Sequence, residues 1–180
     1  MHESQPLVSM ENNFASTLPA EQAKYANEVF RGTYNLGFLG VTSPILELEL
    51  EARLVEKIKR FLLELGDGFT FIGNQHLLEY NGKEYKVDML FFHRKLRCLV
   101  AIDLKIGEFL PEYAGKMNAY LSLLHRLGKG EDENRSIGII LCAEKDNVEV
   151  ALTLEDMGKP IGVADYQLII PKQELQEAEE

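Results

Sequence analysis

Residues 85–106 read YKVDMLFFHRKLRCLVAIDLKI, two apolar segments that predict neighbouring strands of a buried sheet. Charged residues interrupt both segments where core side chains are expected: Asp88 in the first, and Asp103 and Lys105 in the second. A charge in a half-buried strand is costly unless an ion pair or a bound metal compensates it. This stretch therefore predicts both the centre of a β-sheet and a candidate ion-binding site on it.

Turn chemistry predicts which residues face each other across the strands. Asn81-Gly82 is typical of a two-residue type I′ hairpin turn, which places Gln75 opposite Asp88. The next connection has no Gly or Asn, and a two-residue loop at Lys95-Leu96 would place Asp88 opposite Asp103. Directly opposed carboxylates, with Cβ atoms about 4.5–5.5 Å apart, destabilise each other unless a cation lies between them. The predicted row across three strands is therefore a candidate site for a divalent metal.

Two more charged side chains are expected at this row. Lys105 follows Asp103 by two residues, so it projects from the same face of the sheet. Glu51 lies three residues before Leu54, on the apolar face of a helix predicted over residues 46–65, where an acid requires a partner. Two structural interpretations stay open: Asp103 and Lys105 as an ion pair on an exposed sheet surface, and Glu51 as a solvent-facing residue.

The elements around these strands predict an α/β domain with a mixed central sheet flanked by helices. Pro111 begins a helix and Gly128 ends it, at the positions where these two residues are favoured. The elements predicted after the first helix are strands at 69–80, 84–94 and 97–107, the helix at 111–127, a strand at 135–142, a helix near 147–156 and a strand near 161–170.

The chain is predicted to contain one main domain with two short flanking segments. Residues 45–172 carry the elements described above. Residues 1–44 are expected to be an N-terminal arm packed on the domain or a linker remnant, and the polar residues 1–13 are expected to be disordered. The acidic segment 173–180 is predicted to be a frayed tail.

Composition is that of a globular domain, with 46% hydrophobic and 27% charged residues. No apolar run approaches the roughly 20 residues needed to cross a bilayer, and no signal peptide is visible, which indicates a cytoplasmic protein without membrane contact. Cys98 and Cys142 are expected to be buried free thiols. The net charge of −10 disfavours nucleic acid, but residues 51–130 contain 13 basic and 10 acidic residues, a local balance that is compatible with a polyanion.

These residues resemble the PD-(D/E)XK nuclease superfamily, which has a restriction-endonuclease-like αβββαβ core. The superfamily has an Asp in its second strand and (D/E)-x-K in its third, which Asp88 and Asp103-Leu104-Lys105 match. Many members also have an acid in the first helix, which Glu51 matches. Over about residues 45–170 the chain is similar to the C-terminal nuclease domain of the bacterial YhcG-like family. The segments that carry this similarity are 61–66, 88–94, 99–109, 111–118 and 137–142.

The chain departs from the YhcG-like family in two ways. The family usually has Glu where this chain has Asp103, and the shorter side chain can shift a bound metal. Longer members also have an N-terminal helical region that is thought to bind DNA, and residues 18–44 resemble only a remnant of the segment that joins it to the nuclease domain. Target selection is therefore expected to involve a separate recognition domain or protein.

The expected cofactor is Mg²⁺ (or Mn²⁺), because carboxylates are the hard oxygen ligands that these ions prefer. Asp88 and Asp103 are the expected direct ligands, and the superfamily resemblance implies the carbonyl of Leu104 as a third. Glu51 is expected to bind through water or to hold a second ion.

The remaining candidate residues are assigned to the chemistry of phosphodiester hydrolysis. Lys105 is expected to orient the attacking water or stabilise developing charge, and Gln75 to position water or phosphate. The resemblance implies a DNA endonuclease of bacterial DNA processing or defence, and family-level analogy adds a homodimer. The alternatives are RNA as the substrate, and a catalytically inactive nuclease-fold module that binds nucleic acid or protein.

Overall fold

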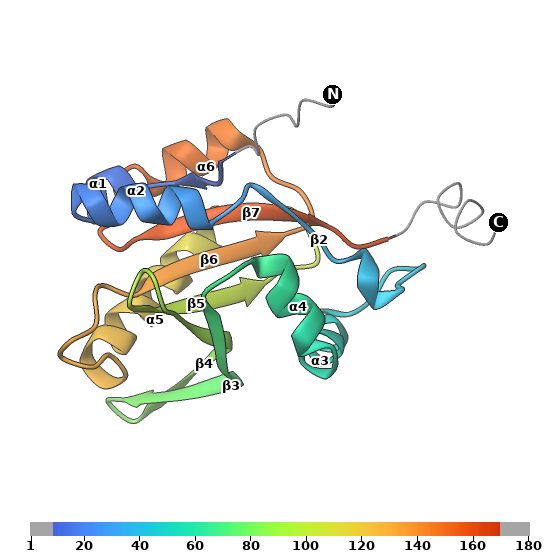
Figure 1. Ribbon diagram of the computed structural model, residues 1–180, viewed down its shortest axis with the longest axis horizontal. Helices are drawn as coiled ribbons and strands as arrows, with labels where there is room; N and C mark the ends of the chain where they lie inside the picture. The colour runs from blue at the N-terminus through green and yellow to red at the C-terminus, as the bar shows by residue number, and fades with distance from the viewer. Residues whose placement is uncertain (1–8, 170–180) are drawn as a thin grey trace.

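The computed structural model describes residues 9–169, which form one mixed β-sheet with helices on both faces (Figure 1). The strand order is β1-β7-β6-β5-β4-β3, and β2 also pairs with β7. Residues 1–8 and the predicted tail at 173–180 lie outside the described residues. The elements are β1 (Glu11–Asn12), α1 (Phe14–Thr17), α2 (Ala20–Val29), β2 (Thr33–Asn35), the 3-10 helix η1 (Gly37–Leu39), α3 (Glu47–Glu56), α4 (Ile58–Leu65), β3 (Phe69–Tyr80), β4 (Lys83–His93), β5 (Cys98–Leu104), α5 (Pro111–Leu127), β6 (Ile137–Cys142), α6 (Asn147–Leu154) and β7 (Ile161–Gln167).

The αβββαβ order expected from the sequence is present from α3 to β6. The antiparallel β3–β4 pairing extends through Asn74↔Met89, and the antiparallel β4–β5 pairing ends at Met89↔Ile102. The β4–β5 pairing has the predicted register throughout, whereas the β3–β4 pairing has it only from Gly73 to Tyr80, because an irregularity between Phe71 and Gly73 shifts the register by one residue. Asp88 and Asp103 are the next residues after this last pair, so they lie across from each other where the two strands stop pairing. Strands β6 and β7 continue the sheet in parallel.

Helices and the N-terminal segment bury the two faces of the sheet in two separate cores. One core includes Phe14, Leu54 and Phe61, so it joins the N-terminal segment to α3 and α4. The other includes Met117 and Leu121 of α5. In Figure 1 the sheet runs from β7 at the top to the β3–β4 hairpin at the bottom, with α3 and α4 on the right. Because both faces are covered, β5 is buried along its whole length, which explains its continuous apolar sequence.

The single helix expected over residues 46–65 is wrong, because the structure has two helices that meet at Lys57. Lys57 leaves the helical conformation, with φ −106° and ψ 40°. Its carbonyl accepts hydrogen bonds from the amides of Arg60 at 3.0 Å and Phe61 at 3.1 Å, which start α4. On either side of this break the two helices keep apolar residues in the same core, Leu50 and Leu54 on α3 and Phe61 and Leu65 on α4.

The expected disorder of residues 1–13 is wrong for Ser9 onward, the part that the structure describes. β1 pairs antiparallel and β2 pairs parallel with the same edge of β7. The side-chain amide of Asn13 donates to the Lys159 carbonyl at 2.9 Å, and its Oδ1 accepts from the Ile161 amide at 2.8 Å. A polar segment is therefore ordered here because a distant strand offers it a complete set of hydrogen-bond partners.

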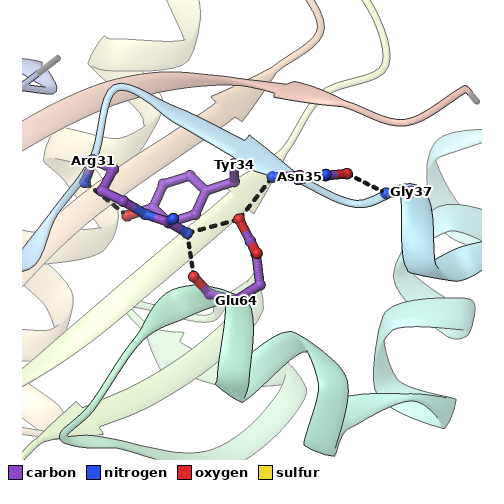
Figure 2. A network of polar contacts seen from close by, with 5 residues as sticks. All are labelled: Arg31, Tyr34, Asn35, Gly37 and Glu64. Atoms are coloured by element: carbon purple, nitrogen blue, oxygen red, sulfur yellow. Dashed lines mark hydrogen bonds and ion pairs between the residues drawn. The ribbon is translucent and has the colours of Figure 1, made fainter. Parts of the chain in front are cut away.

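The following segment is tied to α4 by the polar network drawn in Figure 2. The Arg31 guanidinium donates to the Glu64 carboxylate at 2.7 Å and lies 4.7 Å from the centre of the Tyr34 ring. The same Glu64 oxygen accepts from the Asn35 amide at 2.8 Å. Residues 31–35 therefore pack against α4. The domain boundary expected at residue 45 stays a prediction.

Gly68, in the turn before β3, is required by its backbone and by its neighbour. Its φ is +98°, and a Cβ added there would lie 2.7 Å from Nε2 of His93. The His93 ring is fixed, because Nε2 hydrogen-bonds to the Asp67 carbonyl at 3.1 Å and Nδ1 accepts from the Leu96 amide at 3.2 Å. A side chain at Gly68 would therefore force a buried ring out of place.

We expect Gly68→Ala to lower the free energy of unfolding by about 2–4 kcal/mol, since it combines backbone strain with overpacking. Gly66 is the matched control: its φ is +105°, and a Cβ added there meets nothing within 4 Å. Gly66→Ala should cost only the backbone component, about 1–2 kcal/mol. Urea denaturation of both variants measures the difference. Equal losses in the free energy of unfolding would show that the His93 ring can move aside without an energetic penalty.

Candidate functional site

The candidate site begins where the β4–β5 ladder ends. Asp88 is half-buried, and its Oδ2 accepts a hydrogen bond from the backbone N–H of Leu104 at 2.9 Å. This bond holds the Asp88 carboxylate against the end of β5, next to the carboxyl group of Asp103. The Leu104 side chain itself is buried in the core, so only its backbone is available to the site.

Asp103 is the most deeply buried acid of the site. It is 2% exposed, and its Oδ2 has no hydrogen-bond partner within residues 9–169. Burial raises the pKa of its carboxyl group to about 8, and the hydrogen bond and negative charge of Asp88 act in the same direction. The positive charges of Lys105 and Lys116 oppose this rise. Without a cation, the carboxyl group of Asp103 therefore holds its proton at neutral pH.

Lys105 is held at the site by both its ammonium group and its backbone. Its Nζ lies 3.7 Å from Oδ2 of Asp103, 3.4 Å from Oε1 of Glu47 and 4.7 Å from the centre of the Tyr113 ring. Its carbonyl accepts a hydrogen bond from the Tyr166 hydroxyl at 2.7 Å. Lys105 thus lies on the same face as Asp103, as its spacing predicts.

The charge of Lys105 is stabilised by its neighbours. Burial is the largest single influence and lowers the pKa of the ammonium group, but Asp103, Glu47 and Asp88 together outweigh it and raise the pKa. Lys105 therefore stays protonated across the neutral pH range, and it can donate hydrogen bonds but cannot accept a proton there.

Glu51 and Gln75 meet beside the aspartates. Glu51 is 4% exposed, which excludes a solvent-facing role, and its Oε2 accepts from the Gln75 amide at 2.7 Å. Its Oε1 accepts from the Asn74 amide at 3.3 Å. Burial raises the pKa of Glu51, whereas these two hydrogen bonds lower it. Gln75 has φ +48° within β3, a conformation that turns its side chain toward α3 and interrupts its pairing with Asp88.

We expect Gln75→Ala to destabilise the domain by about 1–3 kcal/mol at pH 8, because it removes the closest donor from a buried carboxylate. The loss should shrink toward pH 4, where Glu51 becomes protonated, since a group with a raised pKa costs stability only as it ionises. Chemical denaturation at both pH values measures this. Combining Gln75→Ala with Glu51→Gln is the control, and a loss that persists in the double variant would contradict the assigned contact.

A cavity of about 440 Å³ connects these groups, and it is lined by the predicted residues Gln75, Asp88, Asp103 and Lys105. Glu51 does not line the cavity and lies behind Gln75. Other residues of the cavity wall were not predicted as site residues, although their spacing from the predicted residues, or from each other, places them on a shared face of a strand or helix. Lys86 precedes Asp88 by two residues on β4, Glu47 precedes Glu51 by one helical turn on α3, and Lys116 and Tyr120 are one turn apart on α5.

The donors of the site fit a divalent cation that keeps much of its water. Among residues 9–169, no three His, Cys, Asp or Glu side chains cluster tightly enough to hold a metal by themselves. The oxygens of Glu51 are occupied by two amides, which leaves Asp88 and Asp103 as the accessible carboxyl groups among the predicted metal ligands. Oδ2 of Asp103, which has no hydrogen-bond partner among the described residues, is the atom that a cation would satisfy. Mg²⁺ commonly binds through one or two carboxylates and retains several waters.

An αβββαβ core with an acid on its second strand and Asp103-Leu104-Lys105 on its third defines a nuclease domain of the PD-(D/E)XK class. A family model described as the YhcG PDDEXK nuclease domain matches residues 27–180, and the chain belongs to this family. It is 37% identical over 153 residues to the Escherichia coli (strain K12) protein named "Putative nuclease YhcG". The match covers 85% of this chain and 41% of that protein, so the chain spans less than half of its relative.

Solved structures with a related fold are remote in sequence. A repair endonuclease from Pyrococcus abyssi is 15% identical, with a TM-score of 0.45 and a match over 73% of this chain and 50% of that chain. The structure of an EndoMS–dsDNA complex is 16% identical, with a TM-score of 0.46 over 73% of this chain and 47% of that chain.

Proposed function

We propose that this domain is a metal-dependent nuclease that hydrolyses phosphodiester bonds in DNA. One observation carries the proposal. The buried Oδ2 of Asp103 has no hydrogen-bond partner among the described residues, and it lies beside Asp88 and Lys105 at a solvent-accessible cavity. A domain kept only for packing gains nothing from a buried aspartate whose pKa is raised by burial and by a second carboxyl group beside it.

Asp88 and Asp103 would hold Mg²⁺ or Mn²⁺, with the carbonyl of Leu104 as a third protein ligand. When bound, such an ion supplies charge neutralisation at the phosphate and makes hydroxide available near neutral pH. Gln75 separates Glu51 from the cavity. Glu51 would therefore act indirectly on the first ion, through water, or would hold a second ion.

Lys105 and Gln75 would position the reacting groups. The ammonium group of Lys105 is fixed by Asp103 and Glu47, so it can orient the attacking water or stabilise charge that develops on the phosphate. The amide nitrogen of Gln75 is used by Glu51, which leaves its carbonyl oxygen to accept a hydrogen bond from water. Both side chains are thus held in place before the substrate arrives.

The cellular role is proposed for the domain alone, because the chain spans 41% of its Escherichia coli relative. We assign it to bacterial DNA processing or defence in the cytoplasm. Target selection is assigned to a separate domain or protein, and pairing of two copies would allow both strands to be cut.

Cleavage of supercoiled plasmid in Mg²⁺, Mn²⁺ and EDTA tests the proposed function, with an RNA of matched sequence in parallel. We expect nicked or linear DNA with either metal and no cleaved DNA in EDTA. If only the RNA is cleaved, the substrate of the domain is RNA and the proposal of a DNA nuclease is wrong. Binding of DNA without cleavage of either polymer would identify the domain as an inactive nuclease-fold module.

A further inference from the structure

The cavity wall contains two lysines that the proposed chemistry does not use. Lys105 is engaged by Glu47 and Asp103, but Lys86 and Lys116 belong to no ion pair within residues 9–169. Both are exposed, and both line the cavity that holds the two aspartates. Two ammonium groups are thus available at the mouth of the candidate site.

Lys86 and Lys116 approach the aspartates from different elements. Lys86 lies two residues before Asp88 on β4, so it projects from the same face of the strand. Lys116 lies on α5, which covers that face of the sheet, and its Nζ is 5.7 Å from the centre of the Tyr120 ring. Tyr120 is 4% exposed, so this ring gives the flexible lysine a fixed surface to rest on.

The charge balance of the cavity depends on a bound cation. Glu47, Glu84, Asp88 and Asp103 line the wall against three lysines, so the charges of the wall nearly balance before a cation binds. One divalent ion makes the balance positive and leaves Lys86 and Lys116 as positive charges at the rim. A polyanion would therefore be attracted more strongly to the cation-loaded site, despite the acidic character of the whole chain.

We propose that Lys86 and Lys116 contact the two phosphates that flank the cleaved bond, one from each wall of the cavity. This inference rests on the proposed function and adds to it the residues that hold the nucleic-acid backbone. Lys86 and Lys116 bind the substrate in its ground state, whereas Lys105 acts on the reacting phosphate. The contacts carry no base specificity, because they reach only the backbone.

Binding of a fluorescein-labelled DNA duplex of about 20 base pairs, in Ca²⁺ and over a salt series, tests this inference. Each of Lys86→Gln and Lys116→Gln should weaken binding about three- to tenfold and lower the log–log salt slope by about one, with the double variant losing about two. Lys86→Arg and Lys116→Arg should restore the slope. In Mg²⁺ the Gln variants should raise KM and leave kcat within about twofold of wild type.

Lys24→Gln on the exposed surface of α2 is the matched control and should behave as wild type. Wild-type binding with unchanged slopes in both Gln variants would overturn the role of the two lysines while leaving the proposed function intact. A thermal melt excludes misfolding as the cause of weaker binding, and a weaker affinity at constant slope would also contradict the proposal. A wild-type protein that neither binds nor cleaves DNA would overturn both proposals together.

Discussion

Asp103→Asn should reduce phosphodiester cleavage by about a thousandfold or more, and it should also stabilise the metal-free protein at pH 8. The first effect follows because the variant loses a metal ligand. The second follows because Asp103 is buried beside Asp88 and its pKa is raised from 3.8 to about 8. A group with a raised pKa contributes stability that is present below pH 4 and lost as the pH rises through 8. Asparagine stays neutral and can still donate a hydrogen bond to Asp88.

Thermal or urea denaturation in EDTA between pH 4 and pH 9 measures the second effect. Wild type should lose about 1–3 kcal/mol over this range from the aspartate pair, and Asp103→Asn should lose much less. Addition of Mg²⁺ at pH 8 should stabilise wild type and leave the variant unchanged. Asp132→Asn, in an exposed turn, is the control. A variant that is inactive and less stable at pH 8 would indicate a structural role for Asp103 instead.

Lys105→Met should lower kcat by about a hundred- to ten-thousandfold while the protein still binds Mg²⁺. Methionine keeps the length and apolar stem of lysine but lacks its ammonium group. Loss of this positive charge, 3.7 Å from Asp103, should leave metal affinity equal or higher. The variant therefore separates the two roles, because Asp103→Asn loses metal and activity whereas Lys105→Met loses activity alone.

Isothermal titration with Mg²⁺ and a plasmid-cleavage assay on the same sample check this prediction. Lys105→Arg is the informative companion, since it keeps the charge but places a larger planar group against Glu47 and Tyr113. It should recover only a small part of the activity. A Lys105→Met protein that cleaves at the wild-type rate would remove Lys105 from the mechanism.

The centre of the fold could be predicted from sequence because its signals are local. The Asn81-Gly82 turn fixes the β3–β4 register from Gly73 onward, and a tight connection centred on Lys95-Leu96 fixes the β4–β5 register. These two registers place Asp88 across from Asp103 and bring Gln75 to the same cavity, and the two-residue spacing then places Lys105. The candidate site is thus predictable to the extent that it lies on one meander of strands.

The parts that the sequence did not predict depend on contacts between distant segments. Pairing of β1 and β2 with β7 joins residues more than a hundred positions apart, and the polar sequence Glu11-Asn12 carries no strand signal of its own. The break at Lys57 depends on how two helices fit one sheet. Glu47 and Lys116 look like ordinary surface residues until α3 and α5 are packed on either side of the aspartates.

Crystals soaked in Mn²⁺ at pH 8 give the most direct test, because the anomalous signal of manganese locates the ion without prior assumptions. The account predicts a peak bonded to carboxylate oxygens of Asp88 and Asp103, with Mn–O distances of about 2.0–2.3 Å. Soaks of Asp103→Asn crystals should show no peak. Wild-type crystals that show no manganese between Asp88 and Asp103 at pH 8 would contradict the metal-dependent mechanism.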